Sequence, residues 1–213
     1  MSPIVTLILA AGKGERLGGP KALLVWPSGA GERPLAIAHA EARLAAESAR
    51  VVIVTRKTMM TALLRHIRPG VELLSSDAAE ELGPAGSLGC AAPRLGDADP
   101  IIVTPVDTVP ARRDTVARLL ARLTAEPALL AARPCYQGRR GHPVVLRAEA
   151  LARYREPSPP PLRQHLAALG ERCADEEVAD PNVLLDLDKP ADVMGVLRTL
   201  PRFYSSSGAL PQP

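Results

Sequence analysis

An apolar run near the start of the chain ends in a loop rich in glycine and in positively charged residues. Residues 4–11 are aliphatic apart from Thr6, and Gly12 closes the run. A short, continuous apolar run that stops at glycine is typical of a strand buried on both faces, as in a parallel sheet. The loop that follows has little side-chain bulk, so its backbone N–H groups can approach a polyphosphate closely. The positively charged residues of the loop can neutralise that ligand. The loop contains Lys13, Gly14, Arg16, Gly18, Gly19 and Lys21.

Three glycine signatures compete for this loop, beside the simpler alternative of an ordinary turn with solvated cations. A dinucleotide-binding loop has the pattern G-x-G-x-x-G. Here Gly12, Gly14 and Gly18 give G-x-G-x-x-x-G, in which the last glycine comes one residue too late. A Walker A loop ends in Gly-Lys-Ser or Gly-Lys-Thr, and neither occurs in the chain. The third pattern, L-x-A-G-x-G-x-R-x-G-x-x-K, opens nucleotidyltransferases that move a nucleoside monophosphate from an NTP to an acceptor. Its specified positions are Leu9, Ala11, Gly12, Gly14, Arg16, Gly18 and Lys21.

The composition fits one α/β domain whose core is built from small and branched aliphatic residues. The chain has 213 residues, of which 46% are hydrophobic and only 2% aromatic. Its net charge is +3 and its cations are scattered, which argues against a nucleic-acid partner. The first apolar run is too short to span a membrane and has no basic segment before it. Three widely spaced cysteines form no disulfide or zinc pattern, so we expect a cytoplasmic protein.

The apolar periodicity predicts alternating strands and helices, hence parallel strands joined by right-handed crossovers. Residues 26–33 are expected to be a flexible loop that covers the phosphate site. Residues 1–200 should form a single domain, followed at 201–213 by a disordered or loosely attached tail. After the first strand, strands are predicted at 51–55, 71–74, 101–104, 128–133, 141–146 and 183–188, and helices at 35–49, 58–67, 112–123, 148–154, 162–169 and 190–200.

Acidic residues follow two of the predicted strands. Asp107 comes just after the strand at 101–104, where a carboxylate can hold a metal ion against a phosphate. An Asx turn or a helix cap is the alternative for this residue. Asp186 and Asp188 would share one face of the last strand. Either is a candidate for the second metal carboxylate. The alternative is that both residues only stabilise the start of the next helix, where negative charge is favoured.

Two further segments have the composition of ligand-binding loops. Residues 81–89 combine glycine, proline and serine at the start of a short helix, where Ser87 and backbone amides can meet a base or ribose. A plain helix-entry turn with Ser87 as its cap is the alternative. Arg139 and Arg140 lie in a turn closed by a Gly-His-Pro segment and could face an anionic acceptor. His142 in that segment is either part of this surface or a structural donor.

The segments LAAGKGERLGGPKALL, ELGPAGSLG, TPVD, GRRGHPVVL and LLDLDKPADV, in this order, are similar to those of the molybdenum-cofactor nucleotidyltransferases. From Ile4 to about Leu200, the chain most resembles the cytidylyltransferase branch of this family, since Leu-Ala-Ala-Gly at 9–12 is common in members that use CTP. The resemblance implies a three-layer α/β/α domain with a mixed, mainly parallel sheet, the Rossmann-like nucleotide-diphospho-sugar transferase fold. It also implies Mg²⁺-dependent transfer of CMP from CTP to molybdopterin or its molybdenum form, with release of pyrophosphate.

The resemblance assigns roles to the candidate residues. Arg16 and Lys21 would be catalytic, and Asp107 with Asp188 would hold Mg²⁺, with Asp186 as the competing ligand. Nucleotide contacts would come from Leu9, Ala11, Gly12, Lys13, Gly14, Gly86 and Ser87. Acceptor contacts would come from Arg139, Arg140 and His142.

The partners implied are CTP or another NTP, a phosphorylated acceptor such as molybdopterin, and a molybdenum hydroxylase, with no nucleic acid or membrane. A sugar phosphate or phospholactate-type acceptor, or a non-catalytic binding protein for nucleotide or molybdopterin, remains open. The chain departs from the family at three places: Pro110 stands one residue late after Asp107, Arg56 stands where a small residue is common, and the segment at 26–33 is longer than usual.

Overall fold

A computed structural model describes residues 2–29, 31–46, 48–75 and 81–210 of the chain. The strands are β1 (Val5–Ala10), β2 (Val25–Ser28), β3 (Gly31–Pro34), β4 (Arg50–Thr55), β5 (Val71–Ser75), β6 (Ile101–Pro105), β7 (Ala131–Tyr136), β8 (Arg139–Arg140), β9 (Val144–Leu146) and β10 (Cys173–Glu177). The α-helices are α1 (Leu35–Leu44), α2 (Lys57–Leu64), α4 (Gly83–Ala91), α5 (Arg113–Ala125), α6 (Ala148–Leu151), α7 (Leu162–Ala168) and α8 (Pro190–Leu197).

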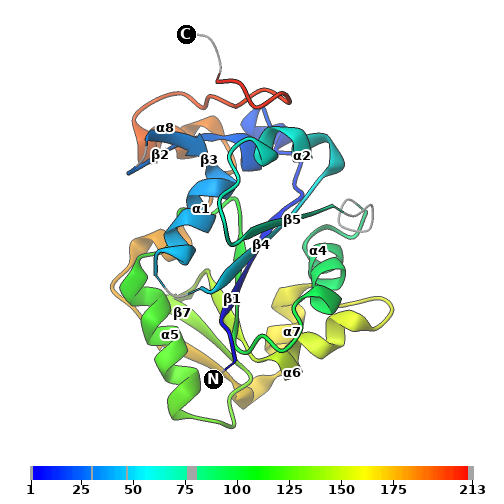
Figure 1. Ribbon diagram of the computed structural model, residues 1–213. Helices are drawn as coiled ribbons and strands as arrows, with labels where there is room; N and C mark the ends of the chain where they lie inside the picture. The colour runs from blue at the N-terminus through cyan, green and yellow to red at the C-terminus, as the bar shows by residue number, and fades with distance from the viewer. Residues whose placement is uncertain (1, 30, 47, 76–80, 211–213) are drawn as a thin grey trace.

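Helices cover both faces of one large sheet (Figure 1). Within the described residues its strand order is β10-β7-β9-β6-β1-β4-β5, and β8 pairs with β7 outside this path. The pairs β6–β1, β1–β4, β4–β5 and β7–β10 are parallel, whereas β9 runs antiparallel to β6 and β7. The predicted three-layer α/β fold with a mixed, mainly parallel sheet is therefore confirmed.

Strand β1 lies at the centre of the core. All six of its residues are buried, as the continuous apolar run predicts. Leu7 and Leu9 pack in a cluster with residues of α4, α6 and α7. Ile8 and Ala10 pack on the opposite face in a cluster with residues of α1, α2 and α8. Both layers of helices are thus anchored on the same strand.

The order of the strands creates a crevice beside β1. From β1 the chain proceeds through α1 to β4 and through α2 to β5, on one side of β1. It then returns to place β6 on the other side of β1. Ligands of open α/β sheets bind at such a switch point, outside the carboxyl ends of the strands. The glycine-rich loop after β1 and Asp107 after β6 both lie at this edge.

The segment at 26–33, predicted to be a flexible loop over the phosphate site, belongs instead to an antiparallel hairpin of β2 and β3. Val25 and Glu32 line a groove together with Val193 and Leu197 of α8. Trp26 is buried, so the hairpin is held to the body of the protein by its own apolar residue. The prediction was wrong because Pro27 and the glycines were interpreted as signs of a loop.

The predicted strand at 183–188 is also wrong. Residues Pro181–Leu184 form a short 3₁₀ helix, and the segment after it makes one isolated bridge, between Asp186 and Thr108. The edge strand beside β7 is instead β10, which the apolar pattern does not reveal. Ion pairs between Arg133 and Asp175 and between Arg118 and Glu176 connect this polar strand to β7 and α5.

The tail expected to be disordered or loosely attached is fixed at residues 202–204. The amide of Val25 donates to the carbonyl of Arg202 at 2.8 Å, and that of Tyr204 to the carbonyl of Leu23 at 2.9 Å. Only 4% of Tyr204 is exposed. The structure corrects the expectation for this part, and residues 211–213 lie outside the described residues.

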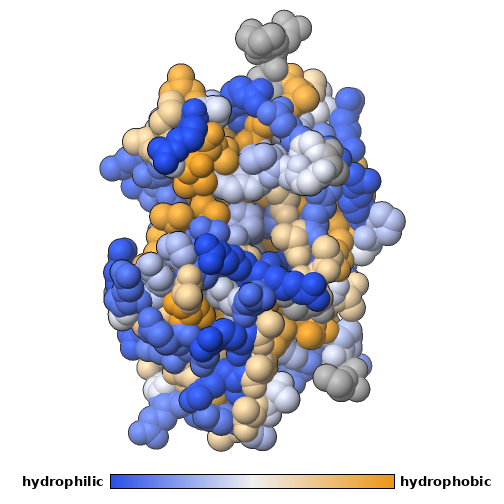
Figure 2. Space-filling model, turned by 90° about the vertical axis from the view of Figure 1, so that its left-hand side faces the viewer, coloured by the Kyte–Doolittle hydropathy of each residue, from blue (hydrophilic) through white to orange (hydrophobic). Residues whose placement is uncertain are grey.

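No helix in the described ranges is long and apolar enough to cross a membrane. Figure 2 shows a face on which hydrophilic side chains are interspersed with smaller hydrophobic areas. The three cysteines are free, as their spacing predicts.

Burial of His39 predicts a pH-dependent stability. The side chain is 3% exposed, and Nε2 donates to the carbonyl oxygen of Thr108 at 2.9 Å. Burial lowers the pKa of His39 from 6.5 to about 4, so the imidazole is neutral in the folded protein. Below pH 6.5 the unfolded chain binds a proton that the folded chain excludes. Acidification to pH 4 should therefore lower the free energy of unfolding by about 3 kcal/mol through this residue.

The measurement is urea denaturation of the wild type and of a His39→Gln variant between pH 7 and pH 4. The variant should lose less stability than the wild type over this interval, because Gln does not titrate. Parallel curves for the two proteins would contradict the assignment.

Candidate active site

A cavity of about 440 Å³ lies at the carboxyl ends of β1, β4 and β6. This volume is in the range of small-molecule sites. Most of the predicted site residues line it together: Leu9, Ala11, Gly12, Lys13, Gly14, Arg16, Lys21, Ser87, Asp107 and Asp188. The motif after β1 and the acidic residues after β6 and before α8 are thus brought to one place.

The glycine-rich loop is folded around the carbonyl oxygen of Gly14. This oxygen accepts from the amides of Leu17 at 2.9 Å, Gly18 at 3.1 Å and Gly19 at 3.2 Å. Leu17 is 1% exposed, so it anchors the turn in the core. Gly14 has a φ of 69°, in the left-handed region that favours glycine. The loop is therefore a hydrogen-bonded turn, and its residues Lys13 and Arg16 line the cavity.

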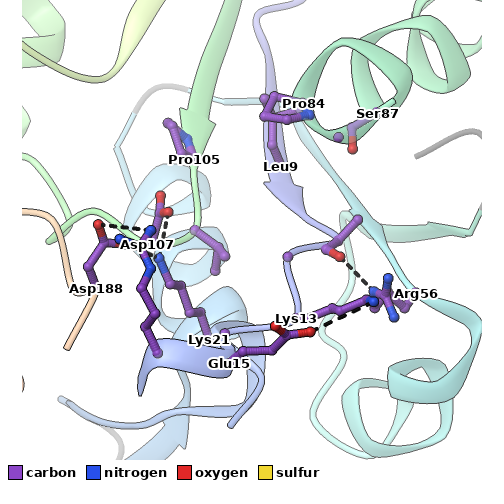
Figure 3. Close-up of a pocket in the computed structure, with 16 residues that line it drawn as sticks. Leu9, Lys13, Glu15, Lys21, Arg56, Pro84, Ser87, Pro105, Asp107 and Asp188 are labelled. Carbon is purple, nitrogen blue, oxygen red and sulfur yellow. Dashed lines mark hydrogen bonds and ion pairs between the residues drawn. The ribbon is translucent and has the colours of Figure 1, made fainter. Parts of the chain in front are cut away.

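Lys21 connects the two predicted metal carboxylates (Figure 3). Its Nζ donates to Oδ2 of Asp107 at 2.9 Å and to Oδ1 of Asp188 at 2.5 Å. Arg16 lies further away, with Nη2 at 3.7 Å from Oδ2 of Asp188. Two cations and two carboxylates, from three separate parts of the chain, thus meet at one end of the cavity.

The pKa shifts in this cluster follow from burial and pairing. Burial alone would lower the pKa of Lys21, but hydrogen bonds to Asp188 and Asp107 outweigh it and raise the pKa above 10.5. The bond from Lys21 holds the pKa of Asp188 below 3.8. Burial, followed by the charges of Asp107 and Asp188, raises the pKa of Asp186. Lys21 and Asp188 therefore form an ion pair over the whole physiological range.

Backbone contacts hold both carboxylates in place. The amide of Leu187 donates to the carbonyl oxygen of Asp107 at 2.6 Å. The amides of Asp188 and Lys189 donate to Oδ2 of Asp192, at the start of α8, at 3.0 and 2.7 Å. Asp186 does not line the cavity. The structure thus pairs Lys21 with Asp107 and Asp188, whereas Asp186 interacts with their charges from outside the cavity lining.

The carboxylates fit a divalent cation of the Mg²⁺ or Mn²⁺ type. Oxygens of Asp107 and Asp188 converge on one ammonium group, and hard oxygen donors are the ligands that such ions prefer. In the described part of the chain, no set of three or more His, Cys, Asp or Glu is arranged to hold a metal ion. Two carboxylates suit Mg²⁺ sites that are completed by water and substrate phosphates.

The opposite end of the cavity has a residue that the sequence analysis did not include in the site. Arg56 follows β4 and lines the cavity beside Pro84 and Ser87 of α4. Its Nε donates to the carbonyl oxygen of Ala11 at 2.8 Å. The signal that could have identified it is its position, directly after a buried strand that is parallel to β1. Gly86, predicted to contact the nucleotide, is buried in α4 and does not line the cavity.

The predicted acceptor residues lie outside the cavity lining. Arg140 is paired with Asp175, with Nε at 2.9 Å from Oδ2, and Arg139 is exposed on β8. His142 is more deeply placed. Burial lowers its pKa, against the charge of Asp107, and its Nδ1 has no hydrogen-bond partner among the described residues. A role for these three residues in acceptor binding stays a prediction.

The loop geometry predicts different effects for two neighbouring glycines. A Cβ on Gly14 would lie 2.0 Å from the carbonyl oxygen of Gly19, in a left-handed backbone, whereas a Cβ on Gly12 would meet nothing within 4 Å. We expect Gly14→Ala to lower the free energy of unfolding by about 2 kcal/mol and Gly12→Ala to change it little. Urea denaturation measures both, and equal stability of the two variants would contradict this account of the turn.

Comparison with known proteins places this site in a family. Residues 6–175 match the model of the MobA-like NTP transferase domain. A molybdenum cofactor guanylyltransferase of Shewanella halifaxensis is 33% identical over 140 residues, which are 66% of this chain and 64% of that protein. The match thus spans somewhat less than two thirds of that relative.

Solved structures share the fold at low sequence identity. The homologue of Mycobacterium tuberculosis Rv0371c from Mycobacterium sp. strain JC1 is 21% identical, with 92% of this chain and 95% of that chain covered and a TM-score of 0.73. Rv0371c of M. tuberculosis in complex with manganese is 19% identical, with 93% and 100% covered and a TM-score of 0.68. Since the family model covers most of the chain, the protein belongs to the MobA-like NTP transferase family.

Proposed function

We propose that the protein is a divalent-metal-dependent nucleotidyltransferase that transfers CMP from CTP to molybdopterin or its molybdenum form and releases pyrophosphate. The observation that carries the proposal is the cluster in which Lys21 meets Asp107 and Asp188 beside the glycine-rich loop. In this cluster the ammonium and the carboxylates are paired with one another. It supplies positioning and charge stabilisation, which are what phosphoryl and nucleotidyl transfer need.

The reaction follows from the charges along the cavity. An oxygen of the acceptor phosphate attacks the α-phosphorus of the nucleotide in line, and the bond to the β-phosphate oxygen breaks. Pyrophosphate leaves, and no protein nucleophile is required because the acceptor phosphate is already an anion. Arg16 and Lys21 stabilise the charge on the α-phosphate and on pyrophosphate. The backbone of Gly12 and Gly14 leaves room for the triphosphate.

Asp107 and Asp188 are the residues that would hold the metal ion. Mg²⁺ bound there would neutralise negative charge on the phosphates. Lys21 then has the triphosphate as an alternative partner, because an ammonium can bind either a carboxylate or a phosphate oxygen. Asp186 is the weaker candidate, since it is not among the residues that line the cavity.

GTP is the second candidate nucleotide. Leu-Ala-Ala-Gly at 9–12 favours CTP, whereas the relative from Shewanella halifaxensis is a guanylyltransferase. A molybdenum hydroxylase as recipient and a cytoplasmic location stay predictions from the sequence.

The direct test is pyrophosphate release with Mg²⁺ and each of the four NTPs in turn, with molybdopterin, a sugar phosphate or a phospholactate-type compound as the acceptor. Release of pyrophosphate with CTP supports the proposal. Release with GTP alone would mean that GTP, and not CTP, is the donor nucleotide. Release only with a sugar phosphate or a phospholactate-type acceptor replaces the acceptor. Nucleotide or molybdopterin binding without any release would show a non-catalytic binding protein and overturn the proposal.

Lys21→Ala should lower kcat about 10²- to 10³-fold, the usual loss when one preorganised donor to a charged transition state is removed. Lys57→Ala makes the same change on an exposed residue outside the cavity lining and should leave turnover unchanged. Steady-state pyrophosphate release measures both. Turnover of the Lys21 variant at the wild-type rate would exclude a catalytic role for this ammonium.

Asp188→Asn should raise the Mn²⁺ concentration for half-maximal turnover at least about tenfold, because a neutral amide replaces a charged ligand. Asp186→Asn is the matched control and should change this concentration little. A larger effect of the Asp186 change would assign the metal to that residue. Electron paramagnetic resonance of free Mn²⁺ in the presence of nucleotide gives a second measure of metal affinity.

A further inference from the structure

The two carboxylates of the site are connected to each other through the backbone. The amide of Leu187, the residue before Asp188, donates to the carbonyl oxygen of Asp107 at 2.6 Å. Beside this bond, Thr108 forms an antiparallel bridge with Asp186. The loop after β6 is thus bonded to the segment before α8. A shift of Asp107 would therefore also shift the neighbour of Asp188.

The loop after β6 is buried, so its backbone needs partners inside the protein. Val106 and Thr108, the two neighbours of Asp107 in the sequence, are both buried. A buried carbonyl group costs free energy unless it accepts a hydrogen bond. Strand β6 ends at Pro105, so the pairing of the sheet does not reach the carbonyl group of Thr108. A donor has to come from another element.

The donor to this carbonyl group is His39 of α1. Its Nε2 donates to the oxygen of Thr108 at 2.9 Å, and the imidazole also interacts with the backbone of Val106. One side chain thus contacts the residues on both sides of Asp107. His39 itself is buried and does not line the cavity. It can therefore influence the site only through the groups that it holds.

Helix α1 is a rigid support for this contact. Arg43, one turn after His39, is buried as well, and its Nη2 donates to the carbonyl oxygen of Ala111 at 2.9 Å. Residues four positions apart lie on the same face of a helix, so one face of α1 holds the loop at two points. Ile37 of α1 packs in the same cluster as Ile8 of β1. The anchor is therefore fixed relative to the central strand.

We propose that His39 is a positioning residue for the metal ion: by holding Thr108 it fixes the separation of the carboxylates of Asp107 and Asp188, and with it the affinity of the site for the ion. The inference rests on the proposed function for the role of these carboxylates as metal ligands. Removing an outer-shell partner of a metal ligand typically lowers metal affinity about ten- to a hundredfold. A neutral substitution of His39 leaves the charges that line the cavity in place, so its effect on affinity would come from geometry.

Two substitutions of similar shape test the proposal. Gln and Met are nearly isosteric, but only Gln has an N–H that can donate to Thr108. We expect His39→Gln to bind Mn²⁺ as tightly as the wild type, and His39→Met to bind it about ten- to a hundredfold more weakly. Electron paramagnetic resonance of free Mn²⁺ at a fixed CTP concentration measures this affinity, after correction for the Mn²⁺ that CTP binds without protein. Equal affinities of the two variants would overturn the proposal.

Ile37→Ala separates positioning from a general loss of stability. Ile37 is fully buried in the same helix, and its side chain has no donor to offer to the loop. The substitution leaves a cavity that destabilises the protein, but it should leave the Mn²⁺ affinity of the folded protein unchanged. A loss of affinity as large as that of His39→Met would mean that any loosening of α1 is sufficient, and this would overturn the role of the hydrogen bond.

Hydrogen exchange gives a readout that requires no metal ion. The amide of Leu187 should exchange faster in His39→Met than in His39→Gln, because its acceptor belongs to the loop that His39 holds. The amides of β4 should exchange alike in both variants. Equal exchange at Leu187 would contradict the proposal. If the Met variant does not fold, His39→Asn replaces it, since its amide is one methylene too short to reach Thr108.

The failure of this inference can be told apart from the failure of the proposed function. A protein whose Gln and Met variants differ in Mn²⁺ affinity, but which releases no pyrophosphate, would defeat the proposed function and support the role of His39. A protein that releases pyrophosphate while both variants bind Mn²⁺ equally well would do the reverse.

Discussion

The contact of Lys21 with Asp107 and Asp188 joins three parts of the chain that the sequence keeps far apart. One carboxylate follows β6, the other precedes α8, and the ammonium comes from the loop after β1. Each charge is partly removed from water, and a lone charge there would be costly to bury. The bond from Lys21 lowers the pKa of Asp188, and it does so in the place where a triphosphate would bring further negative charge.

The sheet explains why these groups meet. Because β6 and β4 both run parallel to β1, the residues that follow them arrive at the same edge. The change of direction beside β1 opens a crevice there, and α4 closes its far side with Pro84 and Ser87. Loops on a rigid frame of this kind can vary in sequence without disturbing the core. Arg56 lies in such a loop, at a position set by the pairing of β4 with β1.

The continuous apolar strands and the site residues next to them could be predicted, since burial on both faces leaves a clear pattern at β1, β4 and β6. Strand β10 could not, because it is held by ion pairs such as Arg133–Asp175 and its polar sequence has no apolar alternation. The segment before α8 shows the opposite error, a strand predicted where none forms. Its leucines give the apolar pattern of a strand, yet its bridge is to Thr108, in the loop after β6. The sequence marks Arg56 only as a departure from the family pattern, because its place in the cavity wall depends on which strand lies beside β1, a fact of topology and not of local sequence.

The glycine-rich loop is contacted by a residue that lies after α8, far away in the sequence. A Cβ on Gly19 would lie 2.9 Å from the ring of Phe203, and the backbone around Phe203 is bonded to residues 23 and 25. The loop after β1 is therefore completed by a segment that follows α8 and is synthesised after the whole sheet. A nascent chain has β1 and its glycines long before it has the aromatic ring that packs against them. Competence to hold a nucleotide should thus be acquired only after the segment around Phe203 has been synthesised.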